Sequence, residues 1–522
     1  MKTYNLYVNG QDVTSSRVEY SPVVTDMLLH PRETLKTISA LKKGEDIQKE
    51  RENSILGKYY LADENHIEQA IESASQAFKV FKNIPIKKRL NMLIDINAEL
   101  KNKREEFIDL LIAEGHPRRL AVWQYENMVN GTLKENDEFY FSLLQRRIKN
   151  GNDEEIILTQ KPDGVILVVP PRNAPASNSF VSISALINGN VLIIKPPQKL
   201  PISTIFLWRE IVQKAADKNK LPKGVINIIQ GNSSLILDKC LASEKVKTVF
   251  IFGESEQGIE LGKKVYSHSK KPILELSGND TMLIWKDVNL SNPLLESSLE
   301  AFLGSTQICM VPKIFLIHPA IYEQYVQFLA SNIHQVKAGL PNDNATWLSP
   351  VGKKKEYFQF LHDATDKGAK IITGGESINL DGESDPNGLF IQPTLLKIDD
   401  YHMFMNMQCF QKEIFFPLIP LVKVGDKNLT DNEIADKMIE ITDNNKYGLR
   451  ISIWLKDQNI RDKFINGINN CGSIRFNSRH IGFSKFMSTH GGTGLTGGPQ
   501  GEMNYMCLRA GHLQGISVRN DD

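Results

Sequence analysis

Between about residues 163 and 278, short runs of apolar, mostly β-branched residues alternate with helix-like segments. Each run is apolar at nearly every position, which is typical of strands covered on both faces. The runs are residues 165–169, 191–194, 225–229, 249–252 and 273–276. Strand–helix–strand repeats of about 30 residues predict right-handed βαβ units and a doubly wound parallel sheet. Because ligands bind beyond the carboxyl ends of strands in such sheets, function is expected in the loops that follow them.

A second series of α/β elements begins almost directly after this region. Its expected helices are residues 320–338 and 432–444. Its expected strands are residues 282–285, 314–317, 369–372, 418–423, 451–454 and 473–476. A chain of 522 residues is too long for one ordinary hydrophobic core. The sequence therefore predicts an α/β protein with a doubly wound first domain and a second α/β domain.

Three other segments have a recognisable pattern. Residues 66–112 are expected to be helical throughout, because apolar residues recur there at three- and four-residue spacing. Residues 146–160 are largely polar with a turn signal at residues 150–152, which predicts a projecting hairpin. Glycine recurs throughout residues 491–501, and this composition predicts a loop.

Composition excludes several classes of function. The 62 basic and 61 acidic residues are mixed along the chain, so neither a nucleic acid nor a strongly charged partner is expected. No apolar run approaches the ~18 residues that span a bilayer, and the N-terminus lacks the apolar core of a signal peptide. The five cysteines form no CxxC pair, which favours a reducing cytoplasm over a disulfide framework. No metal site is predicted.

Three residues suggest a specific chemistry. Cys309 ends the segment Phe302-Leu-Gly-Ser-Thr-Gln-Ile-Cys309, and Glu275 ends an apolar run about 34 residues upstream. Asn173 lies in the turn after a buried strand, where a side-chain amide is able to meet a developing oxyanion. A thiol nucleophile with a general base indicates catalysis through a covalent thioester. Each residue also has a purely structural interpretation: a buried cysteine, a surface carboxylate and a turn asparagine.

Taken together, these segments resemble the aldehyde dehydrogenase superfamily, with the motifs in the family's order from the N-terminal strand to about residue 505. The resemblance implies oxidation of a small-molecule aldehyde by a homodimer or homotetramer. It also implies three structural parts: a Rossmann-like NAD(P)-binding domain (1–143 and 163–277), a catalytic domain (278–498) and a small oligomerisation arm (144–162 and 499–522).

The resemblance assigns a role to each of the three residues. Cys309 would attack the aldehyde carbon, and collapse of the thiohemiacetal would transfer hydride from that carbon to the cofactor and leave a thioester. Glu275 would activate the water that hydrolyses this thioester, and Asn173 would donate to the oxyanion together with the backbone N–H of Cys309. Relatives that transfer the acyl group to coenzyme A commonly lack this base, so Glu275 favours release of a free acid.

The resemblance also implies a site for NAD or NADP. Lys195 matches the lysine that binds the adenosine ribose. Gly253 and Gly258 match the turn where the diphosphate meets a helix N-terminus. Glu413 and Phe415 match the carboxylate at the nicotinamide ribose and the aromatic residue beside it.

Two further positions bear on the choice between NAD and NADP. Gln198 stands where NAD-preferring members usually carry Glu, and Arg172 stands where Trp is usual. Loss of a carboxylate and gain of a guanidinium both make a 2′-phosphate more acceptable. Use of both cofactors is therefore expected.

Several residues depart from the family pattern. Glu254 replaces a Ser at the phosphate turn and is expected to point outward, and Phe416 replaces a Gly and is a candidate to crowd its loop. Gly304 replaces Asn in the cysteine segment. Residues 490–502 look more like the branch that oxidises semialdehydes from aromatic-ring degradation. Two alternatives stay open: a catalytically silent member kept for binding or structure, and a thioester enzyme that transfers its acyl group, for example to coenzyme A.

Overall fold

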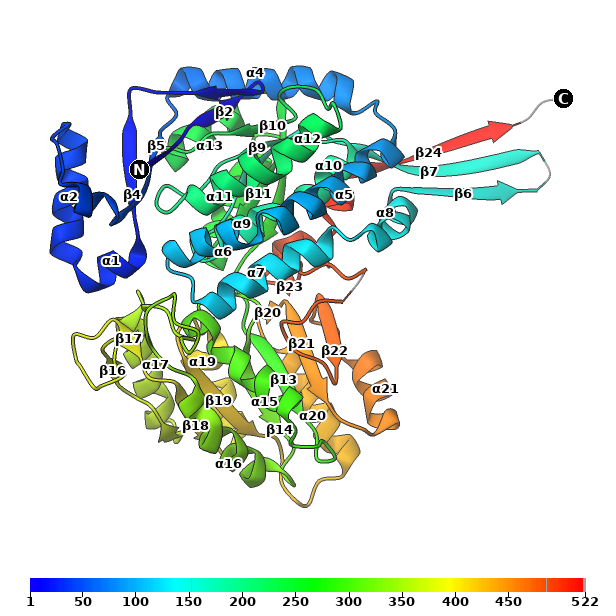
Figure 1. Cartoon of the computed structure of the whole chain (residues 1–522). Coiled ribbons are helices and arrows are strands. Elements are labelled where there is room, and N and C mark those ends of the chain that lie inside the picture. The colour runs from blue at the N-terminus through cyan, green and yellow to red at the C-terminus, as the bar shows by residue number, and fades with distance from the viewer. Residues whose placement is uncertain (152, 485, 520–522) are drawn as a thin grey trace.

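The polypeptide forms two α/β lobes from which a three-stranded arm projects (Figure 1). The computed structural model describes residues 1–151, 153–484 and 486–519. Each lobe is built on a seven-stranded sheet in which most neighbouring strands are parallel. The α/β fold class and the doubly wound first domain are therefore confirmed.

The first lobe contains the sheet β12-β11-β8-β9-β10-β2-β3. Its five parallel strands are those of the alternating region: β8 (Val165–Val169), β9 (Val191–Ile194), β10 (Ile226–Ile228), β11 (Val246–Phe252) and β12 (Lys271–Glu275). Two N-terminal strands, β2 (Leu6–Val8) and β3 (Gln11–Val13), extend the sheet in antiparallel pairing. All four side chains of β9 are fully buried, as its unbroken apolar run predicts.

The first lobe also contains a set of helices. They are α4 (Glu64–Phe81), α5 (Ile86–Asn102), α6 (Arg104–Ala113), α7 (Arg118–Gly131), α8 (Asp137–Leu144), α9 (Pro175–Phe180), α10 (Ile183–Asn188), α11 (Ile202–Phe206), α12 (Gln213–Lys218), α13 (Ser233–Ala242) and α14 (Ser255–Ser267). The continuous helix expected over residues 66–112 is instead three helices, α4 to α6. Pro85 precedes α5, and a proline cannot continue the hydrogen-bond ladder of the helix before it.

An N-terminal excursion lies beside this lobe (Figure 1). The strands β1 (Lys2–Tyr4), β5 (Ile55–Tyr60) and β4 (Val18–Pro22) form a small sheet. Between β4 and β5 the chain forms α1 (Val24–Leu29), α2 (Pro31–Lys43) and α3 (Lys49–Glu52). None of these helices is among the predicted elements, because their apolar residues are few and form no long periodic pattern.

The second lobe contains the sheet β15-β18-β19-β14-β13-β21-β22. Its strands are β13 (Asp280–Ile284), β14 (Pro312–Ile317), β15 (Lys370–Thr373), β18 (Thr394–Ile398), β19 (Leu418–Lys423), β21 (Arg450–Trp454) and β22 (Ser473–Phe476). Its longer helices are α15 (Asn292–Leu299), α16 (Tyr322–Asn332), α17 (Lys354–Asp366), α20 (Asp431–Asp443) and α21 (Gln458–Gly467). Along β14, Ile314 and Leu316 face one core while Phe315 and Ile317 face another, so both faces of the sheet are covered.

The arm is an antiparallel sheet in which β7 (Glu154–Pro162) lies between β6 (Gln145–Asn150) and β24 (Gly511–Arg519). This sheet contains the hairpin that the polar segment predicts, although Asn152 of the predicted turn and residues 520–522 of the predicted arm lie outside the described residues. The short helix α22 (Met506–Arg509) precedes β24 and buries Met506 in the core of the first lobe. The domain boundaries stay predictions.

Candidate active site

The segment that leads to Cys309 is a tightly turned loop between η3 (Glu300–Thr306) and β14. Gly304, Ser305 and Thr306 have φ angles of 60°, 60° and 61°, a left-handed conformation that strains residues other than glycine. Two hydrogen bonds stabilise it: Ser305 Oγ donates to the carbonyl of Ser349 at 2.6 Å, and the N–H of Ser349 donates to Ser305 Oγ at 2.9 Å. The loop is thus fixed in a conformation that a free chain would avoid.

The Cys309 side chain is half-buried at the end of this loop. Burial raises the pKa of the thiol to about 12, while the positive charge of Lys313 acts in the opposite direction. A thiol in this environment is neutral unless neighbouring groups favour the thiolate. The groups around Cys309 therefore decide whether it is able to act as a nucleophile.

Asn173 reaches the cysteine loop from the first lobe. It follows β8, and its Nδ2 donates a hydrogen bond of 2.8 Å to the carbonyl of Gln307. Gln307 precedes Cys309 by two residues. The side-chain amide and the thiol thus lie on adjoining segments, as the sequence predicts.

Glu275 is the last residue of β12 and is buried. Its Oε2 accepts a 3.1 Å hydrogen bond from the N–H of Gly491, and its Oε1 accepts a hydrogen bond from Nδ2 of Asn504. Burial raises the pKa of the carboxyl group to about 7, although both hydrogen bonds favour the ionised form. This carboxyl group is therefore able to exchange a proton near neutral pH.

The segments of Glu275 and Cys309 are in direct contact. A Cβ atom at Gly278 would lie only 2.4 Å from the carbonyl oxygen of Cys309, so glycine is required for this close approach. Cys309, Glu275 and Asn173, which come from three distant segments, are thus brought together at one place between the lobes.

The glycine-rich C-terminal segment covers Glu275 and includes the short strand β23 (Thr493–Gly494). Besides the bond from Gly491, the N–H of Leu276 donates to the carbonyl of Thr496 at 2.8 Å. Thr496 Oγ1 donates to the carbonyl of Ser277 at 2.7 Å. The segment predicted only as a loop is therefore part of the wall around the candidate base.

Lys195 lies just beyond β9 and is buried. Its ammonium donates to Ser233 Oγ at 2.6 Å. Burial, together with the positive charge of Arg172, lowers the pKa of Lys195 to about 8, which places these two cations near each other. The side chain of Gln198 is exposed, while its carbonyl accepts a 3.0 Å hydrogen bond from the hydroxyl of Tyr59.

The turn before α14 leaves space for a ligand. A Cβ atom at Gly253 would meet nothing within 4 Å. The side chain of Glu254, the N-cap residue of α14, makes no capping hydrogen bond, while Ser277 Oγ accepts a 3.3 Å hydrogen bond from the N–H of Ser255. At Gly258 a Cβ atom would lie 2.2 Å from Cδ2 of Leu276, so this glycine permits close helix–strand packing. The carboxylate of Glu254 forms an ion pair with Lys353 of the second lobe instead of capping the helix.

Glu413 and Phe415 lie beside Lys313. The ammonium of Lys313 donates to Glu413 Oε1 at 2.7 Å and lies 5.5 Å from the centre of the Phe415 ring. The N–H of Gly278 also donates to Glu413 Oε1, at 3.1 Å. Glu413 is thus joined to the segment that separates Glu275 from the second lobe.

Phe416 does not crowd this loop. Its side chain is fully buried and packs edge-on against Tyr357 and Phe360, with ring centres 5.6 and 5.0 Å away. The ring of Phe415 has different neighbours, because the ammonium groups of Lys313 and Lys353 lie over it. The substitution of a glycine by Phe416 fills the core of the second lobe.

Two cavities are lined by residues other than Cys309, Glu275 and Asn173. One has a volume of about 430 Å³. Much of its polar lining comes from Asn127, Asn130, Asn136, Ser177, Ser488 and Asn504. The other, of about 830 Å³, is lined by charged and aromatic side chains that include Arg119, Trp123, Glu300, Trp347 and Arg479. Asn504 lines the smaller cavity and also donates a hydrogen bond to Glu275.

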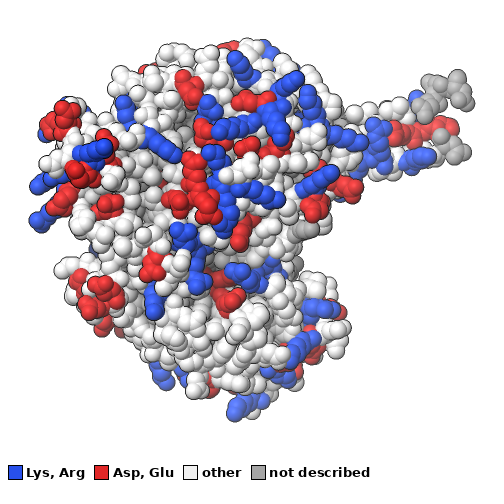
Figure 2. All heavy atoms as spheres, in the orientation of Figure 1, with Lys and Arg blue, Asp and Glu red and all other residues white. Residues whose placement is uncertain are grey.

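Other classes of site are not indicated. Within the described ranges, no three His, Cys, Asp or Glu side chains are grouped as metal ligands. No helix in the described part of the chain is both long and apolar enough to cross a membrane. Figure 2 shows acidic and basic side chains interspersed over the face in view.

Comparison with known proteins identifies the family. The model named aldehyde dehydrogenase family matches residues 39–509, which is most of the chain. The chain belongs to the aldehyde dehydrogenase family. Like its relatives, it is an oxidoreductase that oxidises an aldehyde with NAD or NADP as cofactor.

Two curated relatives and two solved structures illustrate the likeness. A lactaldehyde dehydrogenase of Methanocaldococcus jannaschii is 28% identical over 405 residues, which cover 77% of this chain and 81% of the relative. A D-glyceraldehyde dehydrogenase (NADP(+)) of Picrophilus torridus is 27% identical over 422 residues, covering 79% and 81%. The fold is shared with aldehyde dehydrogenase 21 of Physcomitrella patens (TM-score 0.80, 21% identity, coverage 99% and 98%). It is also shared with the glyceraldehyde-3-phosphate dehydrogenase GapN of Methanocaldococcus jannaschii (TM-score 0.74, 24% identity, coverage 90% and 97%).

Sequence reasoning missed several residues that surround the site. Lys313 offers a weak signal, because a lysine at the start of an apolar strand is unusual. Asn504 and Lys353 offer none, since each reaches its carboxylate partner, Glu275 or Glu254, across a long stretch of chain. Only the packed fold brings these pairs together.

Proposed function

We propose that this enzyme converts its aldehyde to a free carboxylic acid through a thioester on Cys309. The observation that carries the proposal is the buried carboxyl group of Glu275, held next to the segment of Cys309. A general base in that position activates water, which favours hydrolysis over transfer of the acyl group to another carrier. The presence of all three candidate catalytic residues in one place also argues against a catalytically silent member.

The proposed mechanism assigns one task to each residue. The Sγ atom of Cys309 attacks the aldehyde carbon. The amide of Asn173 and the backbone N–H of Cys309 donate to the resulting oxyanion, and a donor of this kind contributes ~3 kcal/mol. The bound nicotinamide supplies the hydride acceptor. Glu275 then takes a proton from the water that hydrolyses the thioester.

The proposed cofactor site has donors that suit a dinucleotide. The N-terminus of α14 beside Gly253 suits a diphosphate, and the open space at that glycine leaves room for one. Gly258 keeps the helix close to the sheet at this point. Lys195 is placed to bind the adenosine ribose, and the carboxylate of Glu413, with Phe415 beside it, suits the hydroxyl groups of the second ribose.

We propose a small hydroxylated aldehyde as the substrate. Two of the relatives carry the names lactaldehyde dehydrogenase and D-glyceraldehyde dehydrogenase. The polar lining of the smaller cavity near Glu275 also suits hydroxyl groups. A semialdehyde, which the C-terminal loop favours, is the second candidate. Action in the cytoplasm stays a proposal from cysteine usage.

A panel assay tests this function. The protein is incubated with lactaldehyde, glyceraldehyde and semialdehydes, with NAD or NADP, and absorbance near ~340 nm reports reduced nicotinamide. We expect turnover without coenzyme A and a free acid as product. Turnover that requires coenzyme A would establish acyl transfer, and a protein that binds the cofactor but reduces none of it would establish the silent alternative.

The Gln198→Glu variant is expected to weaken NADP binding selectively. A carboxylate at this position would repel a 2′-phosphate, at a cost of ~1–3 kcal/mol for a partly desolvated contact, and would leave NAD binding nearly unchanged. Lys195 and Arg172 remain to attract the phosphate, so dual use of NAD and NADP is expected for the wild type. Calorimetric titration of both cofactors measures the difference. The Gln69→Glu variant, which adds the same charge at an exposed site on α4, is the control; equal losses for NAD and NADP would show that Gln198 does not face the ribose.

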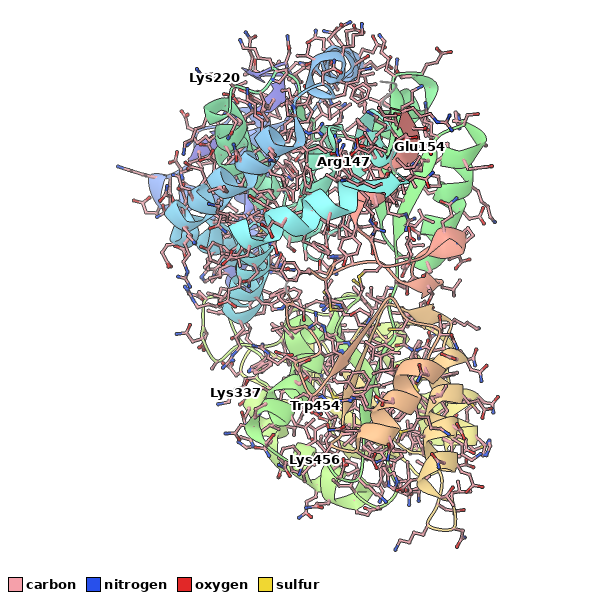
Figure 3. All side chains as sticks on the ribbon, turned by 90° about the vertical axis from the view of Figure 1, so that its right-hand side faces the viewer. Arg147, Glu154, Lys220, Lys337, Trp454 and Lys456 are labelled. Carbon is pink, nitrogen blue, oxygen red and sulfur yellow. The ribbon has the colours of Figure 1, made fainter. Side chains whose placement is uncertain are left out.

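We propose that the arm mediates assembly into a homodimer or homotetramer. The arm projects from the body of the molecule, and Figure 3 looks onto it from that side, with Arg147 and Glu154 labelled on β6 and β7. Leu513 of β24 is 61% exposed and Ile148 of β6 is 49% exposed. A small projecting sheet with exposed apolar side chains gains stability when a second copy covers it.

Light scattering at micromolar concentration is expected to give at least twice the mass of one chain. The Leu513→Glu variant is expected to shift the protein towards monomer, because a charge buried in the interface lacks a partner. Leu35→Glu, at an equally exposed leucine on α2, serves as the control and leaves the mass unchanged. A wild-type protein that is only monomeric would contradict the proposed role of the arm.

A further inference from the structure

Lys313 is a buried cation close to the candidate nucleophile. It follows Cys309 by four residues and is the second residue of β14, an otherwise apolar strand. Its side chain has no exposed surface. A lysine is almost never fully buried unless it is paired, because removing an ammonium from water costs several kcal/mol. The groups that pair with the Lys313 ammonium therefore indicate what this buried charge does.

Both partners of the ammonium join Lys313 to the active site. The Nζ atom donates to the carbonyl of Gly278 at 2.7 Å and to Glu413 Oε1 at 2.7 Å. Gly278 is the residue that packs directly on the carbonyl of Cys309. The ammonium of Lys313 and the backbone of Cys309 thus both contact the same residue, Gly278.

Glu275 is less well placed to favour the thiolate. Both of its carboxylate oxygens accept hydrogen bonds, one from Gly491 and one from Asn504. Its negative charge also disfavours a second negative charge on the Cys309 sulfur. The positive charge of the neighbouring Lys313 lowers the pKa of the Cys309 thiol and so favours the thiolate.

We propose that Lys313 is a positioning residue that favours the thiolate form of Cys309 and that Glu413 limits this effect by sharing its charge. This inference rests on the proposed role of Cys309 as the nucleophile. The ammonium acts through its field and through Gly278, and it does not touch the reacting atoms. Removing Lys313 should disfavour the thiolate, whereas neutralising Glu413 should favour it.

Other charges also act on this thiol. The charged groups that interact with Cys309 come from four strands and one loop and are Lys313, Arg450, Glu275, Asp280 and Glu413. Arg450 is a second buried cation, whose guanidinium donates to the carbonyls of His480 and Thr489 and whose backbone N–H donates to Asp280. The substitutions in the test therefore change only Lys313 and Glu413.

Alkylation of the full-length protein by iodoacetamide, without cofactor, tests the proposal. The thiolate sulfur forms a bond to the methylene carbon and iodide leaves, so below the midpoint the rate at Cys309 follows the thiolate fraction. Mass spectrometry measures this rate at matched pH values in the wild type and in Lys313→Met, Lys313→Arg, Glu413→Gln and the double variant Lys313→Met/Glu413→Gln. Cys471, which is also half-buried, is the internal reference for general opening of the fold.

We expect opposite effects from the two single neutralisations. In Lys313→Met the rate at Cys309 should fall by about 3-fold or more, because loss of a nearby opposite charge raises a thiol pKa by about one unit and higher intrinsic nucleophilicity offsets part of this. Lys313→Arg should restore most of the rate, and Glu413→Gln should increase it. The rate at Cys471 should stay constant.

An unchanged rate in a folded Lys313→Met variant, or changes of the same sign in Lys313→Met and Glu413→Gln, would overturn the proposal. If Lys313→Met does not fold because it leaves Glu413 buried and unpaired, the double variant decides the outcome. The double variant must react more slowly than Glu413→Gln alone, and equal rates would overturn the proposal. Alkylation needs no turnover, so these results are independent of whether Cys309 proves to be the nucleophile.

Discussion

The Cys309→Ala variant is expected to lose aldehyde oxidation by ~10³-fold or more, the scale on which removal of a nucleophile acts. Without the sulfur no covalent adduct forms, and water in the vacated space is a far weaker nucleophile. Binding of NAD or NADP should stay near the wild-type value, because the proposed contacts at Lys195, Gly253 and Glu413 do not involve the thiol. Rates of NAD(P) reduction and calorimetric titration of the cofactor measure both effects.

Four other cysteines provide the controls. Cys471 is half-buried in the second lobe, as Cys309 is, and its replacement by Ala should leave turnover unchanged. Cys240, Cys409 and Cys507 are fully buried, so their replacement should cost stability of ~1 kcal/mol through lost packing and little activity. A Cys309→Ala variant that kept a large fraction of wild-type turnover would refute the assignment of the nucleophile.

The architecture was predictable because burial leaves a direct mark on the sequence. Strand β9 is apolar at every position, and this pattern alone indicates a strand covered on both faces. The same reasoning found β14 and β19 in the second lobe. It failed for α2, whose buried side chains are only Thr34 and Thr37, because so narrow a buried face produces no apolar periodicity.

The candidate site was predictable only in part. Cys309, Glu275 and Asn173 belong to local motifs, so their positions could be read directly from the chain. The hydrogen bond between Glu275 and Asn504 joins residues 229 positions apart, and no local pattern encodes such a contact. The environment that sets the protonation of each catalytic group therefore becomes visible only in the folded structure.

The residues that depart from the family pattern also show that a local motif does not reveal contacts with distant segments. For Glu254 the sequence predicts only that the side chain points outward, and the fold shows that its carboxylate pairs with Lys353 of the other lobe. Phe416 alone suggests crowding, but its ring fills the core beside Phe360. A substitution that looks unfavourable within its motif is thus accommodated by a partner from a distant segment.

The Glu275→Gln variant is expected to separate the two half-reactions. Thioester hydrolysis should slow by ~10²-fold or more, the usual scale for loss of a general base, because the amide is unable to take a proton from water. Formation of the thioester on Cys309 does not need this base once the thiolate exists. Rapid mixing with aldehyde and cofactor should therefore still give a burst of reduced nicotinamide, followed by a slow steady state.

The pH dependence provides the matching control. Burial raises the pKa of Glu275 to about 7, and the base acts only when it is ionised. The wild-type steady-state rate should therefore rise with pH through about 7 and be lost below it, and Glu275→Gln should lack this rise. Asn504→Ala, which removes a hydrogen bond that favours the ionised carboxylate, should move the rise to higher pH. A Glu275→Gln variant without a burst, with its first turnover slowed as much as the later ones, would instead make Glu275 mainly the group that deprotonates Cys309.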